Sequence, residues 1–254
     1  MVQTAERNSG NEASDNVIHH RHLIAYNEAA KRVSGSVLEI GSGEGYGIRI
    51  LSPLAKEYFA FDKHPTPIDP AFSNVVFHQT HIPPLTGIAD NTIDFVVTFQ
   101  VIEHIKNDRY FLEEVKRVLK PGGKLILTTP NIRMSLTRNP WHIREYTPEQ
   151  MKKLMLDIFP KTEFLGVYGN EKVMKYHDEN RKSIRKFTRF DILNMQYWLP
   201  RCMLRIPYDL ANRMNRNKLH QANTGLVAEV TTSDFFLKEV SDQCFDFFCI
   251  AEKN

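Results

Sequence analysis

The sequence has few of the features that cross-link a small protein through disulfides or metals, or that place a chain in a membrane. Its three cysteines, Cys202, Cys244 and Cys249, match neither a disulfide framework nor a C-x-x-C metal or redox motif. An odd number of thiols favours a reducing compartment. No run of 18 apolar residues occurs, so we expect no membrane-spanning helix. Residues 1–15 lack the apolar segment of a secretory signal, which favours a cytoplasmic location.

The remaining composition is that of a globular protein. Of the 254 residues, 42% are hydrophobic and 25% are charged. A chain of this length can bury a core without disulfides. Neither internal repeats nor low-complexity segments are apparent.

Positive charge is concentrated late in the chain. Residues 181–218 contain ten Lys and Arg residues against Asp191 and Asp209, a net charge of +8. The rest of the chain carries −5. This stretch therefore indicates either an anionic partner or a solvated helical face.

Short apolar runs alternate with helical patterns along most of the chain. Strands are predicted at 37–40, 58–61, 75–77, 95–99, 125–127, 164–167 and 245–251. Helices are predicted at 16–34, 108–119 and 148–158. Thr147, Pro148 and Gln150 form the capping-box pattern that opens the last of these. This alternation is typical of βαβ units and a mainly parallel sheet.

The pattern divides the chain into three parts. Residues 1–15 are predicted to be a flexible tail. Residues 16–170 and 231–254 form the α/β domain, with a final strand that returns to the sheet. Residues 171–230 are a basic, mostly helical insertion that precedes this last strand.

A glycine-rich turn follows the first predicted strand. Glu39-Ile40-Gly41-Ser42-Gly43-Glu44-Gly45 lies where an open parallel sheet binds ligands beyond its strand ends. A dinucleotide fingerprint requires glycine three positions after Gly43, where this chain has Tyr46. Asp62 ends the second strand, 21 positions after Gly41, where a carboxylate can accept both ribose hydroxyls of an adenosine.

The E-x-G-x-G turn resembles motif I of class I S-adenosylmethionine-dependent methyltransferases. Three later segments resemble that family in order and spacing: 94–105, 111–123 and 127–131. The resemblance implies a Rossmann-like sheet of seven strands, mainly parallel with the last one antiparallel, with helices on both faces. It also implies S-adenosyl-L-methionine as cofactor.

The resemblance assigns cofactor contacts. Glu39 is expected at the amino group, Arg21 at the carboxylate and Gln100 near the methionine moiety. The family's acidic residue after the third strand is absent, so Thr80 or a backbone carbonyl takes its place at the adenine. The expected cofactor-binding residues are Glu39, Gly41, Ser42, Gly43, Gly45, Asp62, Lys63, Thr80, His81 and Gln100.

Candidate catalytic residues follow the fourth and fifth strands. Glu103 and His104 lie just past strand four, and histidine is the commonest side chain for proton transfer near neutral pH. His142 lies in the next loop toward the same pocket. These three residues also offer a divalent-metal site, and they resemble a Glu-x-x-Glu-His run of small-RNA 2′-O-methyltransferases. Gln100 replaces the first glutamate of that run, so base catalysis by His104 is favoured, with His142 and Arg144 shaping the acceptor pocket.

The expected activity is methyl transfer, with O-methylation of a small, glycan or lipid-linked acceptor as the leading interpretation. In this respect the chain resembles the methyltransferases of ubiquinone biosynthesis. The alternative is a non-catalytic S-adenosylmethionine-binding or membrane-peripheral protein. Three roles of the insertion stay open: a structural lid, contact of 181–218 with the inner membrane surface, and nucleic-acid binding. Nucleic acid is disfavoured by a pI of 8.6.

Overall fold

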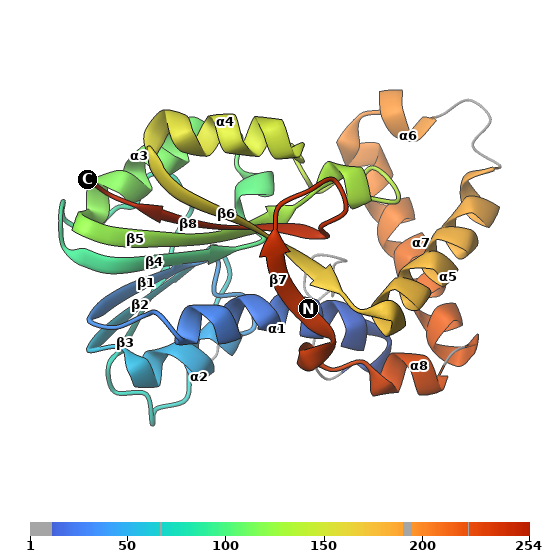
Figure 1. The fold of residues 1–254 in the computed structure, drawn as a ribbon, viewed down its shortest axis with the longest axis horizontal. Coiled ribbons are helices and arrows are strands. Elements are labelled where there is room, and N and C mark those ends of the chain that lie inside the picture. Colours follow the sequence, from blue (N-terminus) through green and yellow to red (C-terminus); the bar gives the residue numbers. More distant parts are fainter. Residues whose placement is uncertain (1–11, 67, 190–194, 223) are drawn as a thin grey trace.

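The structure is a computed structural model that describes residues 12–66, 68–189, 195–222 and 224–254. It contains one eight-stranded sheet with helices packed on both faces (Figure 1). The strand order is β3-β2-β1-β4-β5-β8-β6-β7. The strands are β1 Ser36–Ile40, β2 Glu57–Asp62, β3 Val75–Gln79, β4 Ile93–Phe99, β5 Leu119–Pro130, β6 Lys161–Gly169, β7 Phe235–Glu239 and β8 Asp246–Glu252.

The sheet has the expected parallel part and one strand more than expected. Strands β1 to β5 pair in parallel, and β8 lies antiparallel between β5 and β6. The additional strand is β7, which pairs antiparallel with β6 at the sheet edge. The expectation of seven strands is therefore corrected to eight. Only Phe235 of β7 is buried, so the segment lacks the apolar run that marks a strand in the sequence.

Helices cover both faces of the sheet (Figure 1). On one face α1 Asn16–Ala30 and α2 Tyr46–Leu51 bury Ile24, Leu51 and their neighbours. On the other face of the sheet, α3 Asp108–Val118 and α4 Pro148–Ile158 bury Phe111, Met155 and the apolar residues around them. The capping box predicted at Thr147 is confirmed. Five 3-10 helices connect elements: η1 Ala13–Asp15, η2 Ser52–Leu54, η3 Ile102–His104, η4 Ile132–Met134 and η5 Thr232–Asp234.

The late basic segment is helical and lies at one end of the sheet (Figure 1). It comprises α5 Glu171–Thr188, α6 Met195–Trp198, α7 Arg201–Ala222 and α8 Thr224–Glu229. Several of its arginines turn toward the rest of the protein. Arg201 donates to the Ile143 carbonyl at 2.6 Å, and the guanidinium of Arg205 lies 4.4 Å from the ring centroid of Trp141. Within the described ranges, no helix is long and apolar enough to cross a membrane.

The N-terminal segment is more ordered near its end than a flexible tail over 1–15 requires. Residues 1–11 lie outside the described part of the chain. Ala13–Asp15 form η1, and Asp15 is buried. Arg216 of α7 binds the Asp15 carboxylate at 2.9 Å. This partner is about 200 positions away, so nothing near Asp15 in the sequence indicates that it is held.

Candidate active site

The predicted cofactor residues gather at the carboxyl ends of the central parallel strands. The glycine-rich turn follows β1, Asp62 closes β2, and Gln100 follows β4. This is the edge at which doubly wound sheets bind ligands.

The glycine-rich turn is partly exposed at Gly41 and Gly43, while Gly45 is buried. Gly41, Gly43 and Gly45 have positive φ angles of 84°, 52° and 81°, which only glycine adopts without cost. The N–H of Gly41 donates to the Phe61 carbonyl at 2.7 Å, which ties the turn to β2. A Cβ atom added at Gly43 would have no neighbour within 4 Å, so there is open space over the turn. Ser42 is buried, and its hydroxyl lies 3.1 Å from that of Thr66.

Asp62 lies beside this open space. Its Oδ2 accepts from the Gly43 N–H at 2.9 Å, and its Oδ1 accepts from the His64 N–H at 2.8 Å. Each carboxylate oxygen has two acceptor positions, so the group can still receive the hydroxyls of a ribose. Thr80 donates its N–H to the Asp62 carbonyl at 2.9 Å. Lys63 and His81, the residues that follow Asp62 and Thr80, are exposed, and their role at the cofactor stays a prediction.

Glu39 lies beneath the turn in a buried polar cluster that sequence reasoning missed. Its two carboxylate oxygens accept from the Tyr26 hydroxyl at 3.0 Å and the Tyr58 hydroxyl at 2.8 Å. Burial raises the pKa of Glu39 to about 7, and the two tyrosine hydrogen bonds oppose part of that increase. A Cβ on Gly47 would lie 2.0 Å from Glu39 Oε1, so this glycine lets α2 start against the carboxylate. The expected role of Glu39 at the cofactor's amino group stays a prediction.

Gln100 lies in a strained position at the tip of β4. Its φ of +58° is rare outside glycine and is maintained by its surroundings. Its side-chain NH2 lies 3.3 Å from Thr128 Oγ1 and 3.2 Å from Asp246 Oδ1. Arg21 binds the same carboxylate, with Nε donating to Asp246 Oδ2 at 2.6 Å. Arg21, expected at the cofactor's carboxylate, is thus already paired with Asp246, which sequence reasoning missed.

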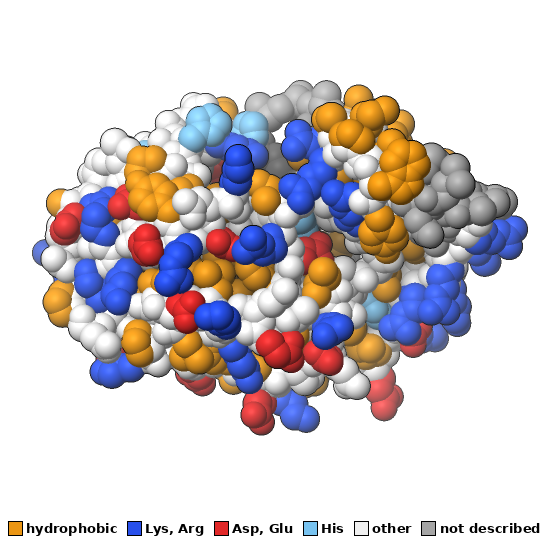
Figure 2. Space-filling view, turned by 90° about the horizontal axis from the view of Figure 1, so that it is seen from above, with side chains coloured by type: hydrophobic (Ala, Val, Ile, Leu, Met, Phe, Trp, Pro, Cys, Tyr) orange, Lys and Arg blue, Asp and Glu red, His pale blue; other side chains and the backbone are white. Residues whose placement is uncertain are grey.

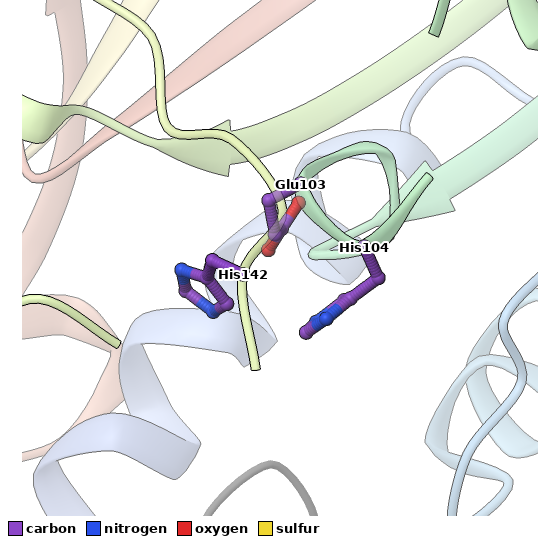
Figure 3. Close-up of side chains that lie close together, drawn as sticks. All are labelled: Glu103, His104 and His142. Carbon is purple, nitrogen blue, oxygen red and sulfur yellow. The ribbon is translucent and has the colours of Figure 1, made fainter. Parts of the chain in front are cut away.

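Glu103, His104 and His142 are brought together as the sequence predicted. Figure 3 shows Glu103 and His104 on η3 and His142 on the loop after β5. The ring centroids of the two histidines are 5.0 Å apart, in an edge-to-face arrangement. The backbone N–H of Ile143 donates to the Glu103 carbonyl at 2.7 Å and fixes the loop against η3.

Hydrogen bonds indicate the tautomer of each neutral ring. Nδ1 of His104 lies 3.1 Å from the Trp141 carbonyl, which only accepts, so Nδ1 carries a proton and, in the neutral ring, Nε2 carries the lone pair. Nδ1 of His142 lies 2.6 Å from Glu145 Oε1. Its Nε2 then accepts from the side-chain amide of Asn139 at 2.8 Å. The pairing of Glu145 with His142 is a second feature that sequence reasoning missed.

The same three residues form a potential metal site. One ligand atom from each lies within 4.8 Å of the others. Glu103 is fully buried, its Oε2 accepts from Thr129 at 2.9 Å, and its Oε1 has no hydrogen-bond partner in the described part of the chain. Burial raises the pKa of Glu103. One carboxylate with two imidazoles suits a transition metal better than Mg²⁺, but binding through Nε2 of His142 requires Asn139 to be displaced.

A cavity of about 310 Å³ opens next to His142. It lies between the loop after β5 and helices α5 and α7, and Arg21 and Phe245 bound it at the sheet end. The late helical segment therefore supplies much of the wall of the space beside the catalytic candidates.

Comparison with known proteins agrees with this geometry. Residues 17–162 match the methyltransferase domain family. Probable S-adenosylmethionine-dependent methyltransferases from Mycolicibacterium smegmatis and Mycobacterium tuberculosis are 33% and 34% identical over 175 and 166 residues. These matches cover 65% and 62% of this chain, and 68% and 60% of those proteins. A ubiquinone biosynthesis O-methyltransferase from Maricaulis maris is 30% identical over 109 residues, 37% of this chain and 40% of that protein.

A solved structure shows the same fold over nearly the whole chain. It is an S-adenosylmethionine-dependent methyltransferase from Thermotoga maritima, described as a possible histamine N-methyltransferase. Its TM-score is 0.52 at 16% identity, and the match covers 93% of this chain and 92% of that one. The family match extends over more than half of the sequence and includes the turn, Asp62, Gln100 and the histidine cluster. The chain therefore belongs to the methyltransferase domain family and is a class I enzyme that uses S-adenosyl-L-methionine.

Proposed function

We propose that this enzyme methylates a hydroxyl oxygen of a small, glycan or lipid-linked acceptor, with His104 as the general base. The observation that carries this proposal is the tautomer of His104. With the Nδ1 proton held on the Trp141 carbonyl, Nε2 is the basic atom, and it belongs to a cluster beside the cavity. An amine acceptor has its own lone pair and requires no such base.

The chemistry needs only proton transfer and alignment from the protein. When bound, S-adenosyl-L-methionine supplies a methyl group activated on a positively charged sulfur. Bound over the turn, the cofactor would supply the methyl carbon for the new C–O bond and would leave as a neutral thioether that keeps the electron pair of the former C–S bond. The hydroxyl proton passes to Nε2 of His104, and the buried Glu103 carboxyl group lies beside the resulting imidazolium. His142, held by Glu145, positions the acceptor, whereas Arg144, which was predicted to share this role, donates to Asp108 at 2.7 Å.

The cofactor is proposed to lie over the turn from Gly41 to Gly45. Asp62 accepts the ribose hydroxyls, with Lys63, Thr80 and His81 on the adenine side. Gln100 lies at the methionine end, and Glu39 supports the turn from below. The open space at Gly43 and the unused acceptor positions of Asp62 support this placement.

Replacement of His104 tests the proposal. We expect His104→Ala to lower kcat on a hydroxyl acceptor by roughly 10²–10⁴-fold, as for other general bases. Binding of S-adenosyl-L-methionine, measured by calorimetry, should be unchanged. His20→Ala, which removes a histidine of α1 bonded to Thr232, is the matched control. Full activity of His104→Ala, or tight cofactor binding by the wild type without turnover on any hydroxyl, contradicts the proposal.

We also propose that α6 and α7 contact an anionic membrane surface. Met203, Ile206, Leu210 and Met214 are between 61% and 72% exposed, and their spacing places them on one face of α7. Figure 2 shows hydrophobic side chains gathered at this end of the molecule, beside Lys and Arg side chains. Such a face suits the boundary between headgroups and acyl chains.

Vesicle sedimentation tests the membrane proposal. Wild-type protein should pellet with vesicles that contain phosphatidylserine, and Ile206→Glu with Leu210→Glu should reduce the pelleted fraction. Arg185→Ala with Lys186→Ala should weaken pelleting mainly at low salt. Equal pelleting of all three proteins would refute the contact.

A further inference from the structure

The cavity beside His142 has a wall that combines apolar surface with many neutral hydrogen-bonding side chains. Amide and hydroxyl side chains of the wall come from the loop after β5 and from both long helices of the late segment, and they include Thr137, Asn139, Asn180, Tyr208, Asn212 and Asn215. Amides and hydroxyls both donate and accept. Such a wall matches a ligand whose own groups do both.

Two amides of the wall, Asn180 and Asn215, are hydrogen-bonded to each other. Asn215 is buried, accepts from the Ser183 hydroxyl at 2.6 Å and donates to Asn180 Oδ1 at 2.8 Å. Since its oxygen is engaged in this way, Asn180 offers its NH2 group as a donor. A network of this kind fixes side-chain orientations before a ligand arrives, which lowers the entropy cost of binding.

The charged groups of the wall already have polar or charged partners within the protein. Arg21 is paired with Asp246, and Arg216 lies 2.9 Å from Asp15. The carboxylate of Glu145 lies 2.6 Å from His142. A phosphate or carboxylate ligand would have to compete with these pairs, two of which involve carboxylates that are almost fully buried.

One buried histidine in the wall has an unmet hydrogen-bonding atom. His177 is 8% exposed, and its Nε2 has no partner in the described part of the chain. Burial lowers the pKa of His177 to about 4, with nearby Arg181 and Arg21 acting in the same direction, so the ring is neutral at pH 7. An unsatisfied buried nitrogen costs free energy, and a ligand hydroxyl would satisfy it where binding turns the ring so that this atom, closed to water without a ligand, faces the cavity.

From this wall we infer that the acceptor is a neutral carbohydrate, bound so that one ring hydroxyl lies at the histidine cluster. This inference rests on the proposed function and narrows its acceptor class. Sugar hydroxyls pair with the amides and with His177, and Phe245 and Ile184 offer apolar surface to the C–H bonds of the ring. The volume of about 310 Å³ is at the small end for ligand sites, so a terminal sugar unit enters while the rest of a glycan stays outside.

A panel of defined acceptors tests the class. The neutral probes are methyl glycosides of glucose, mannose and galactose in both anomeric forms. Glucose 6-phosphate is the anionic sugar, 3,4-dihydroxybenzoate the aromatic acid, and cyclohexanol the single-hydroxyl ring. We expect mass spectrometry to detect methyl transfer to at least one neutral glycoside, with kcat/KM at least tenfold above that for the other three probes.

Variants of the cavity wall test the binding mode. His177→Phe should raise KM for the glycoside about tenfold with little change in kcat, because it removes a hydrogen bond made equally before and during reaction. His177→Gln, which retains a hydrogen-bonding group, should recover part of the loss. Asn212→Leu should act like His177→Phe. The matched control is Asn217→Leu, since Asn217 is an exposed residue of the same helix and does not line the cavity.

A separate measurement of cofactor affinity distinguishes failure of the carbohydrate inference from failure of the proposed O-methylation. If the wild type binds S-adenosyl-L-methionine and methylates the dihydroxybenzoate or the phosphorylated sugar but no neutral glycoside, the carbohydrate assignment is overturned while O-methylation stands. If no hydroxyl acceptor is methylated, both proposals fail. If His177→Phe and Asn212→Leu keep wild-type cofactor affinity and wild-type KM, the inferred binding mode is refuted.

Discussion

The buried carboxyl group of Glu39 gives a prediction that needs no acceptor. In the described part of the chain, its carboxylate oxygens accept hydrogen bonds only from the hydroxyls of Tyr26 and Tyr58. The side chain lies under the turn and is 1% exposed. Among the residues that the structure describes, no lysine, arginine or histidine contributes to this increase of the pKa, so none of them balances the ionised carboxylate. Glu39→Gln replaces the carboxyl group between the two tyrosines with an amide of the same shape and removes the negative charge.

The magnitude follows from the shift of the pKa. The ordinary value is 4.5 and the folded value is about 7. Between these values the folded protein holds a proton that the unfolded chain has lost, so the free energy of unfolding decreases as the pH rises through this window. At 1.36 kcal/mol per pKa unit, ionisation of Glu39 removes about 3 kcal/mol of stability by pH 8. The Glu39→Gln variant has no carboxyl group to ionise here, so its free energy of unfolding does not decrease for this reason.

Urea unfolding at several pH values measures the effect as a difference between proteins. The wild-type profile alone is insufficient, because buried His177, with its pKa lowered to about 4, gains stability as the pH rises toward 6.5. Subtraction of the Glu39→Gln profile cancels this contribution. Glu163→Gln, on the exposed side of β6, controls for loss of a surface charge. A difference between wild type and Glu39→Gln that is constant from pH 4.5 to 8 would refute the reasoning.

Three further predictions concern the cofactor, the metal and one helix. Asp62→Ala should weaken S-adenosyl-L-methionine binding by roughly 10- to 100-fold in calorimetry, since bonds to a charged group are worth about 1.5–3 kcal/mol, whereas Asp69→Ala should not. Methyl transfer should be equal with EDTA and with added divalent ions, because His104 takes the proton; a loss on chelation would favour the metal site. Thr147→Ala should lower the free energy of unfolding by about 1 kcal/mol through loss of the α4 cap.

Sequence reasoning located the parts of the fold that depend on local pattern. The buried strands β1, β4 and β5 have apolar runs, and the α4 cap has a specific residue pattern. The strands and the cap were therefore predictable. Strand β7 was not, because only pairing with β6 at the edge makes it a strand. The same holds for Asp15, whose partner Arg216 comes from the other end of the chain.

Within the site, residue types were predictable and their partners were not. Spacing placed His104 and His142 in one cluster because the ends of neighbouring parallel strands meet. Asp246, however, is 146 residues from Gln100 and 225 from Arg21. Only the return of β8 between β5 and β6 brings these three side chains together. The ion pair of Arg21 with Asp246 could therefore not be inferred before the topology was known.

Helix α7 explains why the sequence motifs identify the chemistry but not the acceptor. One face of the helix, with Tyr208, Asn212 and Asn215, lines the cavity, while the opposite face carries Ile206 and Leu210 to the surface. Neither face takes part in the glycine-rich turn, and the family match ends at residue 162, before the helix begins. Under the two proposals above, acceptor choice and surface contact would change through substitutions in α7 while cofactor binding stays the same. This separation is what allows one fold to serve many acceptors.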